Sequence, residues 1–220
     1  MMSRCHVLTS LALLLVGTPV MAQSTDNVRS WDFVVTLDGD PIGTHRFKVH
    51  QSGLSLTMQG QADFAVKIFG LTLYRYHHEI TSNSKDACLA SLSAQTDDDG
   101  EKTAVAATSS ASATRVVRQR AGSEETVQTV AGCLMDFAYW DQRLLSQTRL
   151  LNPQTGAIEA VQITPGRTGA ILVHGENVNA RSWRILGAAQ PIEVWYSTHG
   201  VWIGLDAHVR GSRTLSYRLP

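Results

Sequence analysis

The chain has 220 residues, of which 43% are apolar and 17% charged, and its 19 Lys and Arg are balanced by 19 Asp and Glu. This balance excludes a partner held mainly by electrostatics, above all nucleic acid, because binding to phosphates needs a basic excess or a basic stripe. No basic run occurs beyond residues 115–120, and no nucleic-acid-binding motif accompanies it. A chain of this length can fold as one domain.

Residues 1–22 have the three parts of a secretory signal peptide. Arg4 makes the amino end positive, residues 7–16 are apolar, and small or tolerated residues precede a predicted cleavage site after Ala22. The apolar part is too short for a bilayer, which needs about 20 residues, and no later stretch is long enough either. We therefore expect residues 23–220 to form a single exported, periplasmic domain without a membrane span.

Apolar and polar side chains alternate most clearly in residues 54–68. The apolar positions are Leu54, Leu56, Met58, Gly60, Ala62, Phe64, Val66 and Ile68. A period of two residues is typical of a strand with one buried face, whereas a helix places apolar residues three and four apart. Phe69-Gly70 interrupts the pattern, which then continues through residues 71–80. We expect a long antiparallel hairpin with a bend or bulge at Gly60, because a glycine inside a strand packs nothing.

Further strands are expected on both sides of this hairpin. They are residues 31–37, 43–49, 88–95, 158–163, 170–173, 180–186, 192–196, 201–209 and 215–219, with a polar turn at 82–86 and weak edge strands within 103–130. Near-helical spacing of apolar residues predicts one short helix at residues 136–145. Turns recur about every 8–12 residues, as in a meander or barrel. The predicted fold is all-β, with long curved antiparallel strands in a half-open barrel.

Cys88 and Cys133 are the two cysteines that remain once the signal peptide, with Cys5, is removed. In an exported protein two thiols are expected to pair, although two buried reduced cysteines are the alternative. A bond that closes a loop of about 45 residues would stabilise the fold by roughly 3–4 kcal/mol. Two cysteines are too few for a zinc site.

No catalytic motif stands out. His77 and Glu79 share one face of a strand, and together with Asp136 or Asp141 they form the alternative prediction of a hydrolase or metal-dependent enzyme. Catalytic zinc needs three protein ligands, and the spacing for a third is absent. Neither a serine elbow nor a glycine-rich phosphate loop occurs, and the acidic run at 97–100 lacks the spacing of a calcium loop. We assign no catalytic residue, metal or cofactor.

Aromatic side chains are the main candidates for a binding site. The predicted ligand-binding residues are Tyr74, Tyr76, His78, Tyr139, Trp140, Trp195 and Trp202. Tyr and Trp combine a large apolar area with a polar tip, so they line ligand grooves as well as cores. We interpret the chain as a non-enzymatic protein that binds an apolar or amphipathic, lipid-like envelope ligand on its curved inner face. A structural module that binds a partner at the 103–130 edge is a further alternative.

Several short motifs, in this order, characterise one protein family. They are Trp31-Asp32-Phe33, Gly43-Thr44-His45-Arg46-Phe47, Tyr74-Arg75-Tyr76, Cys88-Leu89, Phe137-Ala138-Tyr139-Trp140, Leu150-Leu151-Asn152-Pro153 and Val194-Trp195-Tyr196. In these motifs the chain resembles an uncharacterised family of exported bacterial proteins, domain of unknown function 6134 (DUF6134). The resemblance covers nearly the whole mature chain. It implies a periplasmic β-rich domain that retains both cysteines, and it implies no activity.

Overall fold

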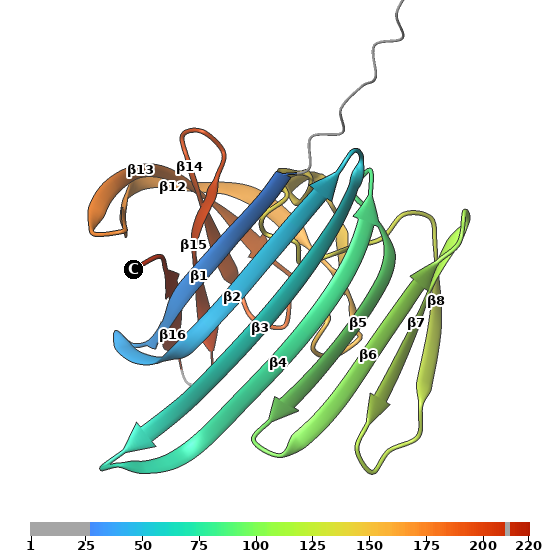
Figure 1. Cartoon of the computed structure of the whole chain (residues 1–220), viewed down its shortest axis with the longest axis horizontal. Helices are drawn as coiled ribbons and strands as arrows, with labels where there is room; N and C mark the ends of the chain where they lie inside the picture. Colours follow the sequence, from blue (N-terminus) through green and yellow to red (C-terminus); the bar gives the residue numbers. More distant parts are fainter. Residues whose placement is uncertain (1–26, 210–211) are drawn as a thin grey trace, which may run out of the picture.

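One curved sheet of 13 antiparallel strands makes up most of the molecule (Figure 1). The structure is a computed structural model that describes residues 27–209 and 212–220, so the predicted signal peptide lies outside the described residues. The first strands are β1 Asn27–Leu37, β2 Asp40–Ser52, β3 Ser55–Ile68, β4 Leu71–Lys85, β5 Cys88–Asp98, β6 Glu101–Ser109, β7 Ala113–Arg120 and β8 Thr126–Ala131. The last are β12 Gln162–Val173, β13 Glu176–Leu186, β14 Ile192–Ser197, β15 Trp202–Val209 and β16 Arg213–Arg218.

The first and last strands meet in the middle of this sheet. β1 to β8 and β12 to β16 form two meanders, and β16 pairs with β1 so that Leu215 lies opposite Leu37. The two edges, β8 and β12, are not paired with each other, so the sheet is curled but not closed. This arrangement confirms the predicted all-β, half-open barrel. The weakly apolar residues 103–130 form β6 to β8, at one edge as expected.

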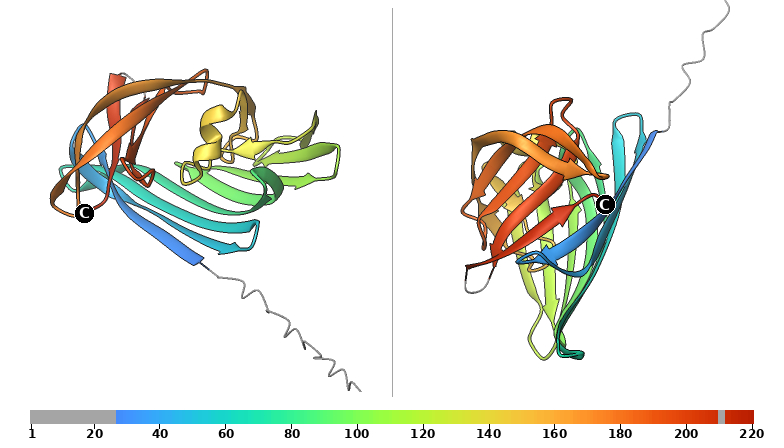
Figure 2. Two further views of the ribbon diagram at one scale, coloured as in Figure 1. Left: turned by 90° about the horizontal axis from the view of Figure 1, so that it is seen from above. Right: turned by 90° about the vertical axis from the view of Figure 1, so that its left-hand side faces the viewer.

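An inserted segment between β8 and β12 lies between the two ends of the curled sheet (Figure 2). It contains β9 Met135–Asp136, the 3₁₀ helix η1 Gln142–Ser146, β10 Arg149–Leu151 and β11 Ile158–Ala160. These three short strands form their own sheet, in which β9 and β10 are parallel. Three leucines of the segment, Leu144, Leu150 and Leu151, are fully buried against the large sheet. The helical turn begins later than predicted because Met135 and Asp136 pair with β10 instead.

The central hairpin β3–β4 follows the predicted alternation, but Gly60 is not a bulge. Gly60 pairs in regular register with Phe47 and Ile80. A Cβ at this position would lie 2.9 Å from Cγ2 of Ile80, so the glycine makes room for that side chain. The irregularity in this ladder lies between Val66 and Lys67.

The turn predicted at residues 82–86 is wrong, because β4 continues to Lys85. Ser82 is buried on the inner face, and Asn83 joins neighbouring strands by accepting from Thr57 Oγ1 at 2.8 Å and donating to Ser91 Oγ at 3.0 Å. Polar side chains therefore continue the ladder here. The chain reverses at Asp86-Ala87, where both residues have positive φ.

The disulfide between Cys88 and Cys133 confirms the predicted pairing, with the two Cα atoms 5.1 Å apart. It joins the first residue of β5 to the start of the inserted segment. Next to it, the Leu89 backbone N–H donates to the Leu134 carbonyl at 2.8 Å. Within residues 27–209 and 212–220, no helix has the length and apolar character needed to cross a membrane.

Candidate ligand-binding cavity

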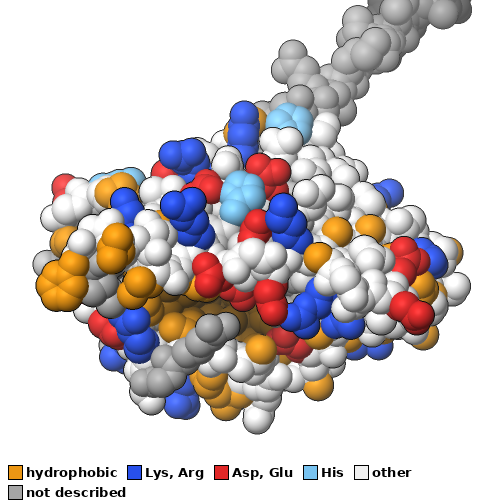
Figure 3. Space-filling view, turned by 90° about the horizontal axis from the view of Figure 1, so that it is seen from below, with side chains coloured by type: hydrophobic (Ala, Val, Ile, Leu, Met, Phe, Trp, Pro, Cys, Tyr) orange, Lys and Arg blue, Asp and Glu red, His pale blue; other side chains and the backbone are white. Residues whose placement is uncertain are grey.

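A cavity of about 230 Å³ lies between the concave face of the large sheet and the inserted segment. Its apolar walls come from Phe47, Met58, Ile80, Trp140, Trp202 and Leu205, and its polar lining includes His45, His78, Asp136, Gln154, Glu159 and Tyr217. Among the described lining residues there is no lysine or arginine. A hollow with a hydrophobic floor is visible on one face of the molecule in Figure 3.

The mouth of the cavity is formed by lining residues that are exposed to solvent, namely Gln154, Ala189 and Gln190. The register places this mouth near the end of the sheet where β14 begins and β15 ends, because Ile192 pairs with Ala207 and both line the cavity. The loop that follows β13 and the turn that follows β10 thus meet at the opening.

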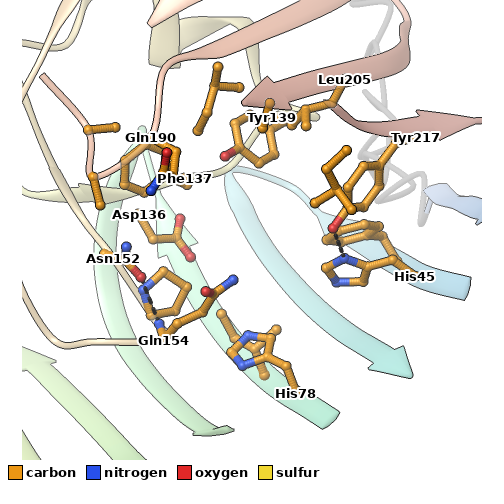
Figure 4. A pocket seen from close by; sticks show the side chains of 18 of the residues that line it. His45, His78, Asp136, Phe137, Tyr139, Asn152, Gln154, Gln190, Leu205 and Tyr217 are labelled. Carbon is orange, nitrogen blue, oxygen red and sulfur yellow. Dashed lines mark hydrogen bonds between the residues drawn. The ribbon is translucent and has the colours of Figure 1, made fainter. Parts of the chain in front are cut away.

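His45 enters the cavity from β2, where alternation turns it to the same side as Phe47. Its ring stacks on Phe47 with a centroid separation of 4.0 Å, and its Nδ1 lies 3.4 Å from the Tyr217 hydroxyl (Figure 4). Its Nε2 is buried and has no hydrogen-bond partner. Burial, with a smaller effect of His78, lowers the pKa of His45 to about 3. The ring is therefore uncharged at neutral pH.

His78 enters from β4, two strands away. Its Nδ1 lies 2.8 Å from the Thr96 hydroxyl on β5. Burial, together with the neighbouring His77, lowers its pKa to about 4. Tyr76, on the same face of β4, stacks against His78 at 6.3 Å between centroids, and its buried hydroxyl also has no partner.

Two carboxyl groups line the cavity from the inserted segment. The Asp136 side chain points into the space that His78 and the His45–Tyr217 pair also face (Figure 4). Burial raises the pKa of Asp136 to about 6, while a hydrogen bond from Ser82 acts in the opposite direction. Glu159 accepts from Asn152 Nδ2 at 2.8 Å and from the Ala189 backbone N–H at 3.2 Å.

Four of the seven predicted ligand residues line this cavity: His78, Tyr139, Trp140 and Trp202. The Tyr139 carbonyl accepts from the Tyr196 hydroxyl at 2.8 Å, and the Trp202 indole donates to the Gly204 carbonyl at 2.9 Å. The Trp202 ring also packs against Phe33 and Tyr139, so much of its surface is already covered by protein.

The other three predicted residues do not line it. Tyr76 lies beside it, and the Tyr74 hydroxyl donates to Asp98 at 2.6 Å. Trp195 packs in a separate cluster with Ile203, and its indole donates to Asp206. Sequence alternation could not show this, because Trp195 and Tyr196 are both buried and so both faces of β14 are covered.

The side chains of the enzyme alternative are not brought together. His77 lies on the outer face of β4, where it contacts Asp63 at 2.6 Å and Glu79 at 3.4 Å, and Asp63 raises its pKa. Asp136 points into the cavity, and Asp141 caps η1 and pairs with Arg143. Among the described residues, no cluster of three or more His, Cys, Asp or Glu could hold a metal ion.

His45 and Tyr217 were missed in the prediction of the site. Both sat on the apolar side of a correctly predicted strand, so alternation did place them inside. The two residues are 172 positions apart in the chain, and the pairing of β16 with β1 brings them together. The sequence feature that could have identified His45 is its position among the apolar residues of an alternating strand.

These features define a class of protein: a curled, half-open antiparallel β-sheet with a cavity on its inner face. The chain belongs to the DUF6134 family, whose sequence profile, "Domain of unknown function (DUF6134)", matches residues 33–219. No curated protein matches the chain.

Among solved structures, the chain is similar to a beta-barrel-like protein of domain of unknown function DUF1849 from Brucella abortus. The TM-score is 0.60 over 87% of this chain and 94% of that chain, with 10% sequence identity. At this identity the likeness concerns the fold alone.

Proposed function

We propose that this protein is exported to the periplasm and binds an apolar or amphipathic, lipid-like molecule in the cavity of its curled sheet. The observation that carries the proposal is the cavity itself, which has aromatic and aliphatic walls, a few inward polar groups and an open end. Ligand sites are concave, largely apolar and equipped with a small number of such polar groups.

The size of the cavity limits the ligand. A volume of about 230 Å³ is just below the roughly 300–1,000 Å³ of pockets that enclose drug-sized molecules. One alkyl chain or one small ring system fits, and a longer molecule would extend through the mouth at Gln154 and Gln190. Burial of each methylene group contributes about 0.8 kcal/mol, so a single chain of moderate length is enough for binding.

Two features support export. Residues 1–22 carry the pattern of a signal peptide. The Cys88–Cys133 disulfide suits an oxidising compartment, because disulfides rarely persist in the bacterial cytosol. Cell fractionation followed by non-reducing electrophoresis tests this part, since export predicts an oxidised, shortened chain in the periplasmic fraction. A full-length chain that stays in the cytosol contradicts it.

Binding is tested by native mass spectrometry after mild extraction from envelopes, followed by titration of the stripped protein with a fluorescent fatty alcohol. Ala189→Trp places a large ring at the exposed mouth and should weaken binding, whereas Ala106→Trp, on an exposed outer position of β6, should not. An interior without a co-purifying molecule, together with no saturable uptake of the probe, would refute the proposal.

The alternative of a partner-binding edge has less support. β8 is the edge strand, but it already contacts the inserted segment: Gln128 donates to the Gly156 carbonyl, and Arg149 donates to the Ala131 carbonyl. These contacts occupy part of the edge that an added strand would need.

A further inference from the structure

One buried nitrogen of the cavity lacks a partner. His45 is 8% exposed, its Nδ1 faces Tyr217, and its Nε2 makes no hydrogen bond. A buried polar group without a hydrogen-bond partner destabilises the fold, so the presence of His45 here needs an explanation. A ligand that bonds to Nε2 would satisfy it.

A second unpartnered atom lies beside the cavity, on a residue that does not line it. The hydroxyl of Tyr76 is buried and makes no hydrogen bond. Phe64 stacks on Tyr76 at 5.3 Å between centroids and lies 6.4 Å from His45, so a continuous aromatic wall carries both atoms. Tyr217 contacts this wall through His45 and Phe64. Of these two atoms, only His45 Nε2 belongs to a residue that lines the cavity, and its uncharged ring offers a ligand hydrogen bonding without a full charge.

The charges around the cavity decide the class of ligand. An anionic head group would meet no lysine or arginine among the described lining residues, and it would lie beside Asp136 and Glu159. A cationic head group would find these carboxylates already engaged by Ser82, by Asn152 and by the Ala189 backbone. Burial of an unpaired ion is far more costly than burial of a neutral polar group.

We propose that the cavity selects an uncharged ligand with one oxygen function on a hydrocarbon body, such as an alcohol, ketone or ester, and that His45 Nε2 hydrogen-bonds to this oxygen. The inference rests on the proposed function and adds the chemical class of the ligand. An alcohol suits the site best, because a hydroxyl donates or accepts and so fits either tautomer of His45. Tyr217 holds the ring from the Nδ1 side.

The test compares probes that share one chain and differ in the head group: 1-octanol, octanoate, octylammonium and 1-chlorooctane. Binding to the full exported protein is followed at neutral pH by calorimetry and by intrinsic tryptophan fluorescence, to which Trp140 and Trp202 in the cavity lining contribute. We expect 1-octanol to bind at least roughly tenfold more tightly than either ion, because the ions lose their hydration.

His45→Phe removes the hydrogen bond and keeps an aromatic ring against Phe47. We expect it to weaken 1-octanol binding by roughly tenfold and to leave 1-chlorooctane unchanged. His208→Phe makes the same chemical change at an exposed position of β15 and should alter neither. His45→Phe leaves the buried Tyr217 hydroxyl without its partner, which could destabilise the fold. The double variant His45→Phe/Tyr217→Phe removes this hydroxyl as well and serves as the second test if the single variant does not fold.

A purely structural role for His45 predicts the reverse: the variants lose thermal stability, and the folded fraction binds 1-octanol as before. That result overturns the inference, as does equal or tighter binding of octanoate or octylammonium. If no probe binds at all, both the proposed function and this inference are refuted. If all probes bind equally, the proposed function stands and only the assignment of the head group falls.

Discussion

Burial disfavours the charged forms of His45, His78 and Asp136 in the cavity. The pKa values of His45 and His78 are lowered to about 3 and about 4, so both rings are neutral near neutral pH. The pKa of Asp136 is raised to about 6, so this carboxyl ionises just below neutrality. Near pH 6, the charge of Asp136 therefore changes while both histidine rings stay neutral.

Asp136→Asn should change how stability depends on pH. Because the pKa of Asp136 is higher in the folded state than its ordinary 3.8, ionisation disfavours the fold, and stability is lost as the pH rises from about 4 to above 6. The shift corresponds to about 3 kcal/mol at about 1.4 kcal/mol per pKa unit. The stability of the variant relative to the wild type should therefore rise as the pH increases from about 4 to above 6, and it should stay constant at higher pH.

Urea denaturation at a series of pH values measures this difference. Asp40→Asn alters an exposed carboxyl and serves as the control. His45 and His78 affect the pH dependence of stability in the opposite direction, because their lowered pKa values reduce stability as the pH falls below about 6.5. Both histidines are present in the variant and in the wild type. They therefore cancel when variant and wild type are compared. A stability difference that is constant between pH 4 and pH 7 would contradict the burial of the Asp136 charge.

At the scale of elements, the β3–β4 hairpin projects beyond its neighbours. Strand pairing with β2 ends at Phe64 and strand pairing with β5 begins at Tyr76, so residues 67–72 pair only with each other. At the base of this ribbon, the Arg75 carbonyl still accepts from the Asp99 backbone N–H at 2.8 Å. Phe69 at the turn is fully exposed, and Leu71 and Leu73 are more than half exposed. A two-stranded ribbon of this kind has little stability of its own in water.

Phe69→Asn should stabilise this ribbon. Phe69 and Gly70 both have positive φ, the conformation of a tight hairpin turn in which Asn-Gly is preferred. A bulky residue in the left-handed region costs roughly 1–2 kcal/mol, and asparagine tolerates that region better. We expect the amides of Ile68 and Leu71, which flank the turn and pair across it, to exchange about fivefold more slowly, equivalent to about 1 kcal/mol.

Leu73→Asn is the matched control, because it also replaces an exposed apolar side chain but lies outside the turn. If both variants slow exchange equally, the gain comes from the lost apolar surface, and the explanation through backbone strain is wrong.

Local periodicity predicted which way side chains point only where one face of a strand is buried and the other is exposed to solvent. It succeeded for β1 to β3 and for the first part of β4, where the two faces differ. It failed at residues 82–86, because Ser82 is buried although it is polar. It could not orient Trp195, because both faces of β14 are covered. The bend or bulge predicted at Gly60 was wrong. A glycine is needed there because the Ile80 side chain lies too close to leave room for a Cβ atom.

At the scale of the whole molecule, the site depends on contacts that no local pattern encodes. Pairing of β16 with β1 brings Tyr217 to His45, and the inserted segment supplies Asp136, Tyr139 and Gln154. The sequence predicted a curved sheet with an inner aromatic surface. It could not predict that residues 132–161 would fold back into the concave face, because this segment has little regular structure of its own.

The Cys88–Cys133 disulfide should therefore control both stability and the shape of the cavity. It fixes the start of the inserted segment to β5, and the leucines of this segment fill the concave face. The bond closes a loop with a sequence separation of 45 residues, for which the chain-entropy relation gives about 3–4 kcal/mol. We expect Cys88→Ala/Cys133→Ala to lower the free energy of unfolding by about this amount.

Because the segment forms one wall of the cavity, the same variant should also bind 1-octanol more weakly, in proportion to how far that wall loosens. Urea denaturation with and without reductant provides the control: the wild type should respond to reductant and the variant should not, since the described residues contain no other cysteine. Unchanged affinity together with the expected loss of stability would mean that the packing of Leu144, Leu150 and Leu151 alone holds the wall in place. An unchanged unfolding midpoint on reduction would show that the crosslink does not restrain the unfolded chain.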